Sequence, residues 1–311
     1  MAITNHRTYD AQAVKASGVA LGGATRITID HGYDAIARQR FNARQGNAVI
    51  SRKGMFVRGS LSCLDVTKFL SVLTAAPEDA DDYLTFYSKQ DGLGVATYHG
   101  RNLLRPRYTS FGLTVPEPPA PSSMEIGFEC LWIKADDSAA TGFEEVDAPV
   151  TASESAVNAL RTNPELVGPV IAATFDGDTI DHRDQFGLRL EFEVRRARNT
   201  DFAGPDSLVP VLSGVTWNLQ HKSNQILTTP NRTLMEELLE ADPGDLVVTL
   251  QKINGAANKT MTLHNAMFTG DPEEHAFDNY GNFNPNGECE TVDSDGTTHR
   301  TLSTNPIIEL A

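Results

Sequence analysis

The sequence predicts a mainly β protein, a β-sandwich or barrel with one flanking helix, built from a duplicated module and α+β overall. Short stretches of alternating apolar and polar residues recur along the 311 residues, which is the pattern of half-buried strands. In addition, one arrangement is written twice, over residues 55–107 and 214–271. It consists of a strand, an amphipathic helix closed by proline, and two strands joined by a glycine-containing turn. We therefore expect two similar β domains in one chain.

The helix of each copy is predicted from apolar residues at helical spacing. The first is expected over residues 65–76 and the second over residues 231–241, and each stops at a proline. Pro77 and Pro243 are 166 positions apart, and the hairpins that follow keep an offset of 165 positions. This near-constant spacing is the strongest regularity in the chain.

Changes in composition divide the chain into five parts. The ends and the middle are polar, acidic or glycine-rich, which is typical of arms, linkers and loops. The predicted parts are an N-terminal arm (1–24), a first β domain (25–135), a linker (136–153), a second β domain (154–271) and a C-terminal loop and tail (272–311).

Two stretches predict strands most clearly. In residues 124–132 alternate positions are apolar and predict one buried face, and residues 186–194 alternate apolar with charged side chains. A short helix is expected to begin at Ser153. Cys63 and Cys130 are expected to be small core residues, because three cysteines far apart form neither a disulfide framework nor a zinc pattern.

The net charge of the chain argues against some classes of function. It has 26 basic and 41 acidic residues, a net charge of −15 with neutral histidines. Such a surface repels phosphate and disfavours specific binding to DNA or RNA. The N-terminus has no apolar signal-peptide core, and no run approaches the roughly 18 apolar residues of a membrane span. We therefore expect a protein made in a cytoplasm, with no membrane partner.

No catalytic or cofactor motif is found. Asp176, Asp178 and Asp181 are the best candidates for a weak cation site, but they lack the order of a calcium loop and favour an acidic turn. His99 and His264 occupy matching places in the two copies, which indicates a shared structural role. We therefore expect no cofactor, no metal and no enzymatic activity.

The two modules, residues 55–107 and 214–271, resemble the tail tube and baseplate-hub family of tailed bacteriophages. The resemblance implies a virion protein of the tail, assembled in the host cytoplasm edge to edge into a ring or tube. DNA would pass through its negatively lined channel without specific binding. Two copies per chain would give a trimeric pseudo-sixfold ring, the alternative being a hexamer, with other phage tail proteins as neighbours. The long C-terminal loop and the arginine-rich stretch 38–53 depart from the simple family pattern.

The expected assembly interface follows from charge and from the hairpin turns. The arginine-rich stretch is either a solvated loop or a contact for an acidic neighbour. The candidate interface residues are Arg38, Arg40, Arg44, Arg52, Lys53, Asp91, Gly92, Gly94, Asn254 and Lys259. The competing interpretations are a monomeric β-sandwich module that binds carbohydrate or protein, and then an enzyme with scattered carboxylates.

Overall fold

The structure is a computed structural model, and the chain in it is mainly β, which confirms the predicted fold class. It describes residues 9–16, 18–38, 49–68, 72, 83–90, 97–117, 119–134, 136–161, 163–180, 185–197, 201–223, 242–254, 257–270, 273–274, 281–293, 296–302 and 305–311.

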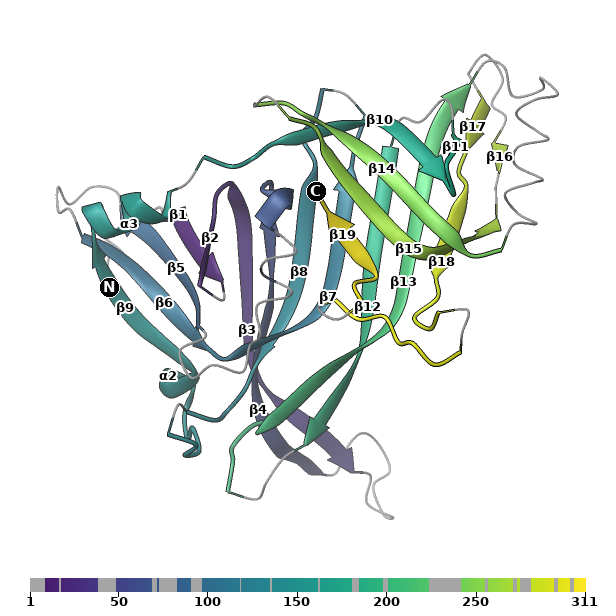
Figure 1. Cartoon of the computed structure of the whole chain (residues 1–311). Helices are drawn as coiled ribbons and strands as arrows, with labels where there is room; N and C mark the ends of the chain where they lie inside the picture. The colour runs from purple at the N-terminus through teal and green to yellow at the C-terminus, as the bar shows by residue number, and fades with distance from the viewer. Residues whose placement is uncertain are drawn as a thin grey trace.

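The first sheet has five antiparallel strands and lies at the left of Figure 1. Its order is β2 (Val19–Leu21), β1 (Tyr9–Ala16), β5 (Tyr83–Gln90), β6 (Thr97–Leu104) and β9 (Asp147–Ser153). Two short helices lie beside it, α2 (Phe143–Val146) and α3 (Glu154–Leu160).

The second sheet has 14 strands. Its main path is β11 (Asp178–Thr179), β10 (Val167–Phe175), β14 (Gly244–Lys252), β15 (Lys259–Gly270), β18 (Asn286–Cys289), β13 (Ser207–Ser223), β12 (Gln185–Ala197), β7 (Pro106–Val115), β8 (Ser123–Cys130), β4 (Val49–Cys63) and β3 (Ala24–Arg38). Off this path, β16 (Glu273–Glu274), β17 (Gly281–Phe283) and β19 (Ile308–Leu310) pair at its margins.

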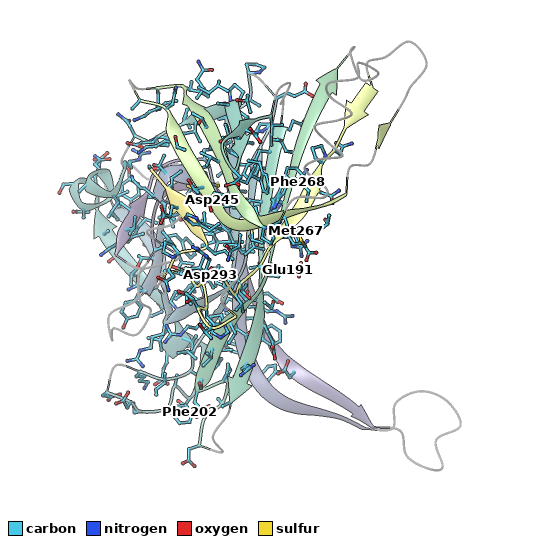
Figure 2. All side chains as sticks on the ribbon, turned by 45° about the vertical axis from the view of Figure 1, so that its right-hand side comes forward. Glu191, Phe202, Asp245, Met267, Phe268 and Asp293 are labelled. Carbon is cyan, nitrogen blue, oxygen red and sulfur yellow. The ribbon has the colours of Figure 1, made fainter. Side chains whose placement is uncertain are left out.

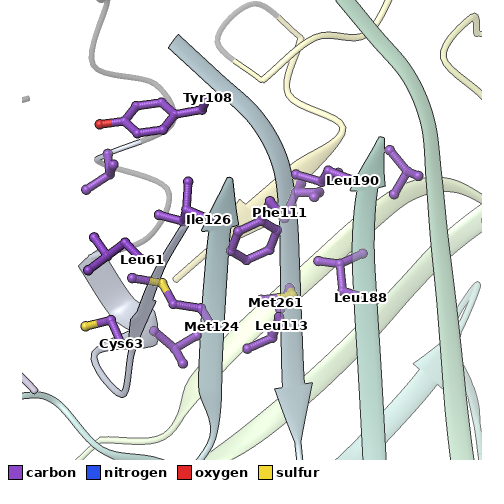
Figure 3. Close-up of a cluster of buried hydrophobic side chains, with 14 of the residues drawn as sticks. Leu61, Cys63, Tyr108, Phe111, Leu113, Met124, Ile126, Leu188, Leu190 and Met261 are labelled. Atoms are coloured by element: carbon purple, nitrogen blue, oxygen red, sulfur yellow. The ribbon is translucent and has the colours of Figure 1, made fainter. Parts of the chain in front are cut away.

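The hydrophobic core lies on one face of the central strands β4, β8, β7, β12 and β13. Leu61, Ile126 and Phe111 point to this side from three neighbouring strands (Figure 3), and all three are at most 1% exposed. Buried residues of the five-stranded sheet and of β14 and β15 belong to the same cluster. Because one side of each central strand packs there, apolar and polar residues alternate along it.

The strand order is repeated. The first sheet contains β2-β1-β5-β6, and the second begins β11-β10-β14-β15, which is the same order of the corresponding strands. In chain order, one long antiparallel hairpin follows the first two strands of each set, β3–β4 after β2 in the first repeat and β12–β13 after β11 in the second. Both hairpins belong to the large sheet. The duplication that the sequence predicts therefore appears as a repeated topology, and it starts earlier than residues 55 and 214, at β1 and β10.

Three predicted boundaries are wrong. Residues 9–21, predicted to be part of an arm, form β1 and β2, because Val14, Ala16 and Leu21 are buried in the core. The predicted linker 136–153 contains α2 and the whole of β9, which pairs with β6. The predicted C-terminal loop contributes β18, which lies between β13 and β15.

Other predictions from the sequence are confirmed. Ser123–Cys130 form β8 with Met124, Ile126, Phe128 and Cys130 buried, and Phe186, Leu188 and Leu190 are buried on β12. Trp132 is buried but lies beyond the end of β8, and Phe192 is only half-buried. The helix α3 begins after Ser153, whose hydroxyl accepts a hydrogen bond from the Ala156 amide.

Only a small part of the two predicted helices lies within the described residues. Of residues 65–76, Val66–Lys68 form a 3₁₀ helix. Residues 69–71 and 73–76, and the predicted second helix at 231–241, lie outside the described residues.

Candidate assembly interface

The longest open sheet edge belongs to β3. This strand has 15 residues and is the last strand on the path of the large sheet, so β4 is its only partner in that sheet among the described strands. No other described strand pairs with its outer edge, and an unpaired edge can template pairing with another chain. The sequence of β3 contains no proline, which would have blocked such pairing.

The corresponding edge in the second repeat is covered within the chain. There β12 takes the place of β3, and β7 pairs with it from Phe186↔Val115 to Glu191↔Ser110. The inward-facing Leu188 and Leu190 of β12 are at most 2% exposed. On β3 the inward-facing Ile27 and Ile29 are only half-buried, because β3 has a neighbouring strand on one side only.

A second open edge is different in chemistry. Residues 207–215 of β13 pair with β12 on one side, whereas β18 and β17 join the other side only from Thr216 onward. This edge contains Pro210, paired with Val194. Proline has no N–H, and within sheets it is found at edges where it hinders further pairing.

The basic candidates on the β3–β4 hairpin are only partly described. Arg38 ends β3 opposite Val49, and Arg52 lies on β4 opposite Ala35. Lys53 falls at the register shift that follows, while Arg40 and Arg44 lie outside the described residues. The described part of this stretch belongs to the long β3–β4 hairpin, which extends away from the body (Figure 2).

The turn candidates are divided in the same way. Asp91, Gly92 and Gly94 lie outside the described residues. Asn254 is occupied within the chain, since its Oδ1 accepts from the Leu166 amide at 3.0 Å and its Nδ2 donates to the Pro164 carbonyl at 2.6 Å. Lys259 begins β15 and is half-buried. Asn254 therefore ties the end of the β14 hairpin to the segment before β10, a role that the sequence pattern did not indicate.

The outer face of the central strands is polar and built from small side chains. One row crosses six strands through Thr28, Ser60, Gly127, Ser110, Glu191 and Gly214. Exposed charged residues on this face include Arg26, Arg58 and Arg189 together with Asp30, Asp34, Glu125 and Glu191.

Two of these arginines have acidic partners. Arg58 lies 3.5 Å from Asp30, and Arg189 lies 3.2 Å from Glu191. All four side chains are more than half exposed, so the pairs contribute little to stability. Their effect on the surface is larger, because each acid offsets a positive charge that would otherwise attract phosphate.

A buried carboxylate fastens β3 to the five-stranded sheet. Asp147 of β9 has a side chain that is 1% exposed. Its oxygens lie 2.6 Å from His31 Nε2 and accept from Arg101 Nε at 2.6 Å and Nη2 at 2.7 Å. The two-pronged geometry from Arg101 makes this a strong link. Phe143 of α2 packs edge-on against His31, with ring centroids 5.6 Å apart.

A cleft of about 1070 Å³ opens beside this cluster, between the start of β3 and strands β5 and β6. Arg26, Phe86, His99, Arg101 and Asp147 are among its lining residues. Asp147 is bound by two partners, His31 and Arg101. The cluster therefore joins β3 to the five-stranded sheet.

The two histidines matched by sequence have different surroundings. His264 Nδ1 lies 2.8 Å from Asp245 Oδ1 and its Nε2 lies 3.6 Å from Glu309. The His99 side chain is exposed and lines the cleft. The predicted shared role is therefore wrong for their side chains.

The candidate cation residues form a turn. Asp176 and Gly177 have φ values of 47° and 93°, which is the left-handed conformation of an Asp-Gly hairpin turn, and it connects β10 to β11. Asp178 begins β11 and Asp181 lies outside the described residues. Among the residues that the structure describes, no cluster of three metal-ligating side chains occurs.

The cysteines are unreactive core residues. Cys63, Cys130 and Cys289 are free and buried. Burial raises the pKa of Cys63 to about 11 and that of Cys289 to about 12, and it raises the pKa of Cys130 further. The thiolate is the reactive form, so none of the three is suited to nucleophilic chemistry near neutral pH.

Comparisons with known proteins do not assign the chain to a family. No protein-family model matches the sequence, and no curated protein is similar to it. In the described part of the chain, no helix has the length and apolar character of a membrane span.

Proposed function

We propose that this chain is a structural subunit of a bacteriophage tail, and that copies of it close into a ring or tube by pairing of sheet edges. The observation that supports the proposal is the unequal state of two equivalent strands. Inside the chain, β7 of the first repeat covers β12 of the second. The same position in the first repeat, the outer edge of β3, has no strand beside it in the described sheet.

A ring would give this edge a partner strand in the next copy. If a strand of the second repeat of one copy pairs with β3 of the next copy, the contact between copies resembles the β7–β12 pairing within the chain. Such head-to-tail contacts close when the rotation per repeat divides a full turn. With two repeats per chain, three copies would give a pseudo-sixfold ring.

The polar outer face of the central strands would form the channel wall. Most residues of the row that crosses this face are small, and its exposed charges are of both signs. In the proposed conduit, two of the three arginines are partnered by acids, which lowers their affinity for phosphate. The net charge of −15 would add a general repulsion of DNA.

The test uses two adjacent proline substitutions in β3, Ile29→Pro and Asp30→Pro. Amide groups of successive strand residues point to opposite edges, so one proline removes a bond to β4 and the other removes only an outward N–H. Mass photometry and negative-stain imaging of the wild-type protein should show closed rings or tubes. We expect one variant to unfold at lower temperature, and the other to keep its unfolding temperature and fail to assemble.

Two results would contradict the proposal. One is a wild-type chain that stays monomeric at high concentration, which would favour a monomeric binding module. The other is normal assembly by both folded variants, which would show that β3 pairs with nothing.

A further inference from the structure

Pairing registers align the two repeats residue by residue. One row of paired residues crosses four strands in each repeat. It consists of Ile29, Gly59, Phe128 and Tyr108 in the first repeat and of Leu188, Trp217, Gly287 and Phe268 in the second. Next to this row, both repeats have the same register shift, after Tyr108 in β7 and after Phe268 in β15. β3 therefore corresponds to β12, and the end of β15 corresponds to the start of β7.

The short strand β16 continues this correspondence. Glu273 of β16 pairs with Phe283 of β17, which pairs in turn with β13. In the first repeat, Leu113 of β7 pairs with Met124 of β8, which pairs in turn with β4. Glu273 follows Leu113 by 160 positions, and Phe268 follows Tyr108 by the same number. β16 is therefore the counterpart of the part of β7 that covers β12.

The edges of β16 and β3 are both open, whereas their counterparts are paired with each other. Within the chain, Leu113 of β7 lies opposite Leu188 of β12. The corresponding residues are Glu273 of β16 and Ile29 of β3. Among the described strands, β16 pairs only with β17, and β3 pairs only with β4.

A second row aligns the remaining strands of the two repeats. It consists of Ala16, Leu84, Leu103 and Asp147 in the first repeat and of Phe175, Leu246, Leu263 and Ile308 in the second. Two positions before Leu103 and Leu263 lie Arg101 and Met261. Met261 is fully buried, whereas the side chain of Arg101 is 48% exposed. The first repeat therefore has an exposed base where the second has a buried apolar residue.

The strand that would cover this base differs in a complementary way. Leu113 and Met261 are at most 2% exposed and belong to one core cluster (Figure 3). The residues at the corresponding positions are Glu273 and Arg101, an acid and a base. Arg101 lines the cleft of about 1070 Å³ that opens between the first residues of β3 and strands β5 and β6. A strand added to the outer edge of β3 would enter this cleft.

We propose that β16 of one copy pairs with β3 of the next copy, with Glu273 opposite Ile29 and Glu274 opposite Thr28. The inference rests on the proposed assembly and names the strand and the register that it uses. Glu273 then approaches Arg101 of the next copy. The contact between copies is thus polar where the equivalent contact within the chain is apolar.

Cysteine cross-linking tests the register. Residues directly opposite each other on antiparallel strands lie within the Cα distance of a disulfide. Thr28→Cys with Glu274→Cys should therefore give covalent oligomers on a non-reducing gel after mild oxidation. In the matched control, Thr28→Cys with Thr269→Cys, the second cysteine is displaced along the strand by about 16 Å and should give none. The native cysteines are free and buried, which keeps the background low.

Charge reversal tests the polar contact. Glu273→Lys should weaken assembly measured by mass photometry, because it brings two positive charges together beside Arg101. Glu274→Lys is the matched control, since successive residues of a strand face opposite sides, and it should weaken assembly less. Equal effects of the two lysines would overturn the contact with Arg101.

Mass photometry of the wild type and of the reduced double-cysteine variants separates the two proposals. If the wild type stays monomeric, the assembly itself is contradicted. If the reduced variants assemble but Thr28→Cys with Glu274→Cys forms no covalent oligomers, or forms no more than the control, the pairing of β16 with β3 is overturned and the assembly stands. If only the double variant fails to assemble, the comparison of the two lysine variants decides.

Discussion

The two repeats of this chain have the same strand order and differ in what covers their edges. In the second repeat, β12 lies between β13 and β7, and its inward-facing leucines are buried. In the first repeat, β3 has β4 on one side only, and its inward-facing isoleucines are half-buried. Strands β12 and β3 therefore have equivalent positions in the two repeats, but only β12 is paired on both sides. Whether the edge is covered depends on the neighbouring strand β7 and not on the topology of the repeat.

A similar contrast separates the two histidine–aspartate contacts. His31 and Asp147 are 2.6 Å apart with a carboxylate that is 1% exposed, whereas His264 and Asp245 are 2.8 Å apart with a carboxylate that is 52% exposed. The distances are similar, and burial distinguishes the pairs. Since solvent screens the exposed pair, the two should differ greatly in their contribution to stability.

The largest effect is expected from Asp147→Ala. The substitution leaves Arg101 and His31 without the partner that they share, and we expect unfolding free energy to fall by about 3 kcal/mol. The same change at the exposed pair, Asp245→Ala, should cost about 0–1 kcal/mol. Urea unfolding of both variants measures the difference. Equal losses would show that burial of Asp147 does not strengthen the link between β9 and β3.

A smaller difference is expected between the two inward faces. Leu190→Ala on β12 removes a fully buried side chain and should cost about 2–5 kcal/mol. Ile29→Ala on β3 removes a half-buried one and should cost about half as much in the dissociated chain. Urea midpoints under dissociating conditions test this. If both variants lose the same stability, the edge of β3 is covered within the chain after all.

The sequence predicted local features well. Alternating runs such as residues 124–130 and 186–190 form strands with the expected buried faces, because period-two burial is a local property. Ser153 likewise marked the start of α3, since a cap acts within one turn.

The sequence failed where a strand depends on a distant partner. β1 is short and rich in small residues, and it pairs with β5, from which it is separated by more than 60 positions. β18 contains Asn286 and Gly287 and resembles a loop until it lies between β13 and β15. Open edges could not be predicted for the same reason. The site prediction accordingly concentrated on charged residues and turns and missed the edge of β3.

The smallest expected effect concerns the joint between the repeats. Glu165 precedes β10 and contacts both halves. The nearby Thr67 hydroxyl lowers the pKa of its carboxylate, and Lys252 and Lys259 lower it further. Lys252 Nζ lies 3.5 Å from Glu165 Oε1. Thr67 follows β4 of the first repeat, whereas Lys252 ends β14 of the second.

Because the folded-state pKa of Glu165 is lowered, its contribution is complete above the ordinary glutamate pKa of about 4.3 and is lost as the pH falls through the lowered value. Urea midpoints between about pH 6 and pH 3 should therefore fall more steeply for the wild type than for Glu165→Gln. Glutamine keeps an oxygen for Thr67 but cannot titrate, so it isolates the charge. Parallel curves would mean that Thr67 and the two lysines do not favour the ionised form of Glu165, and that the joint is held by packing alone.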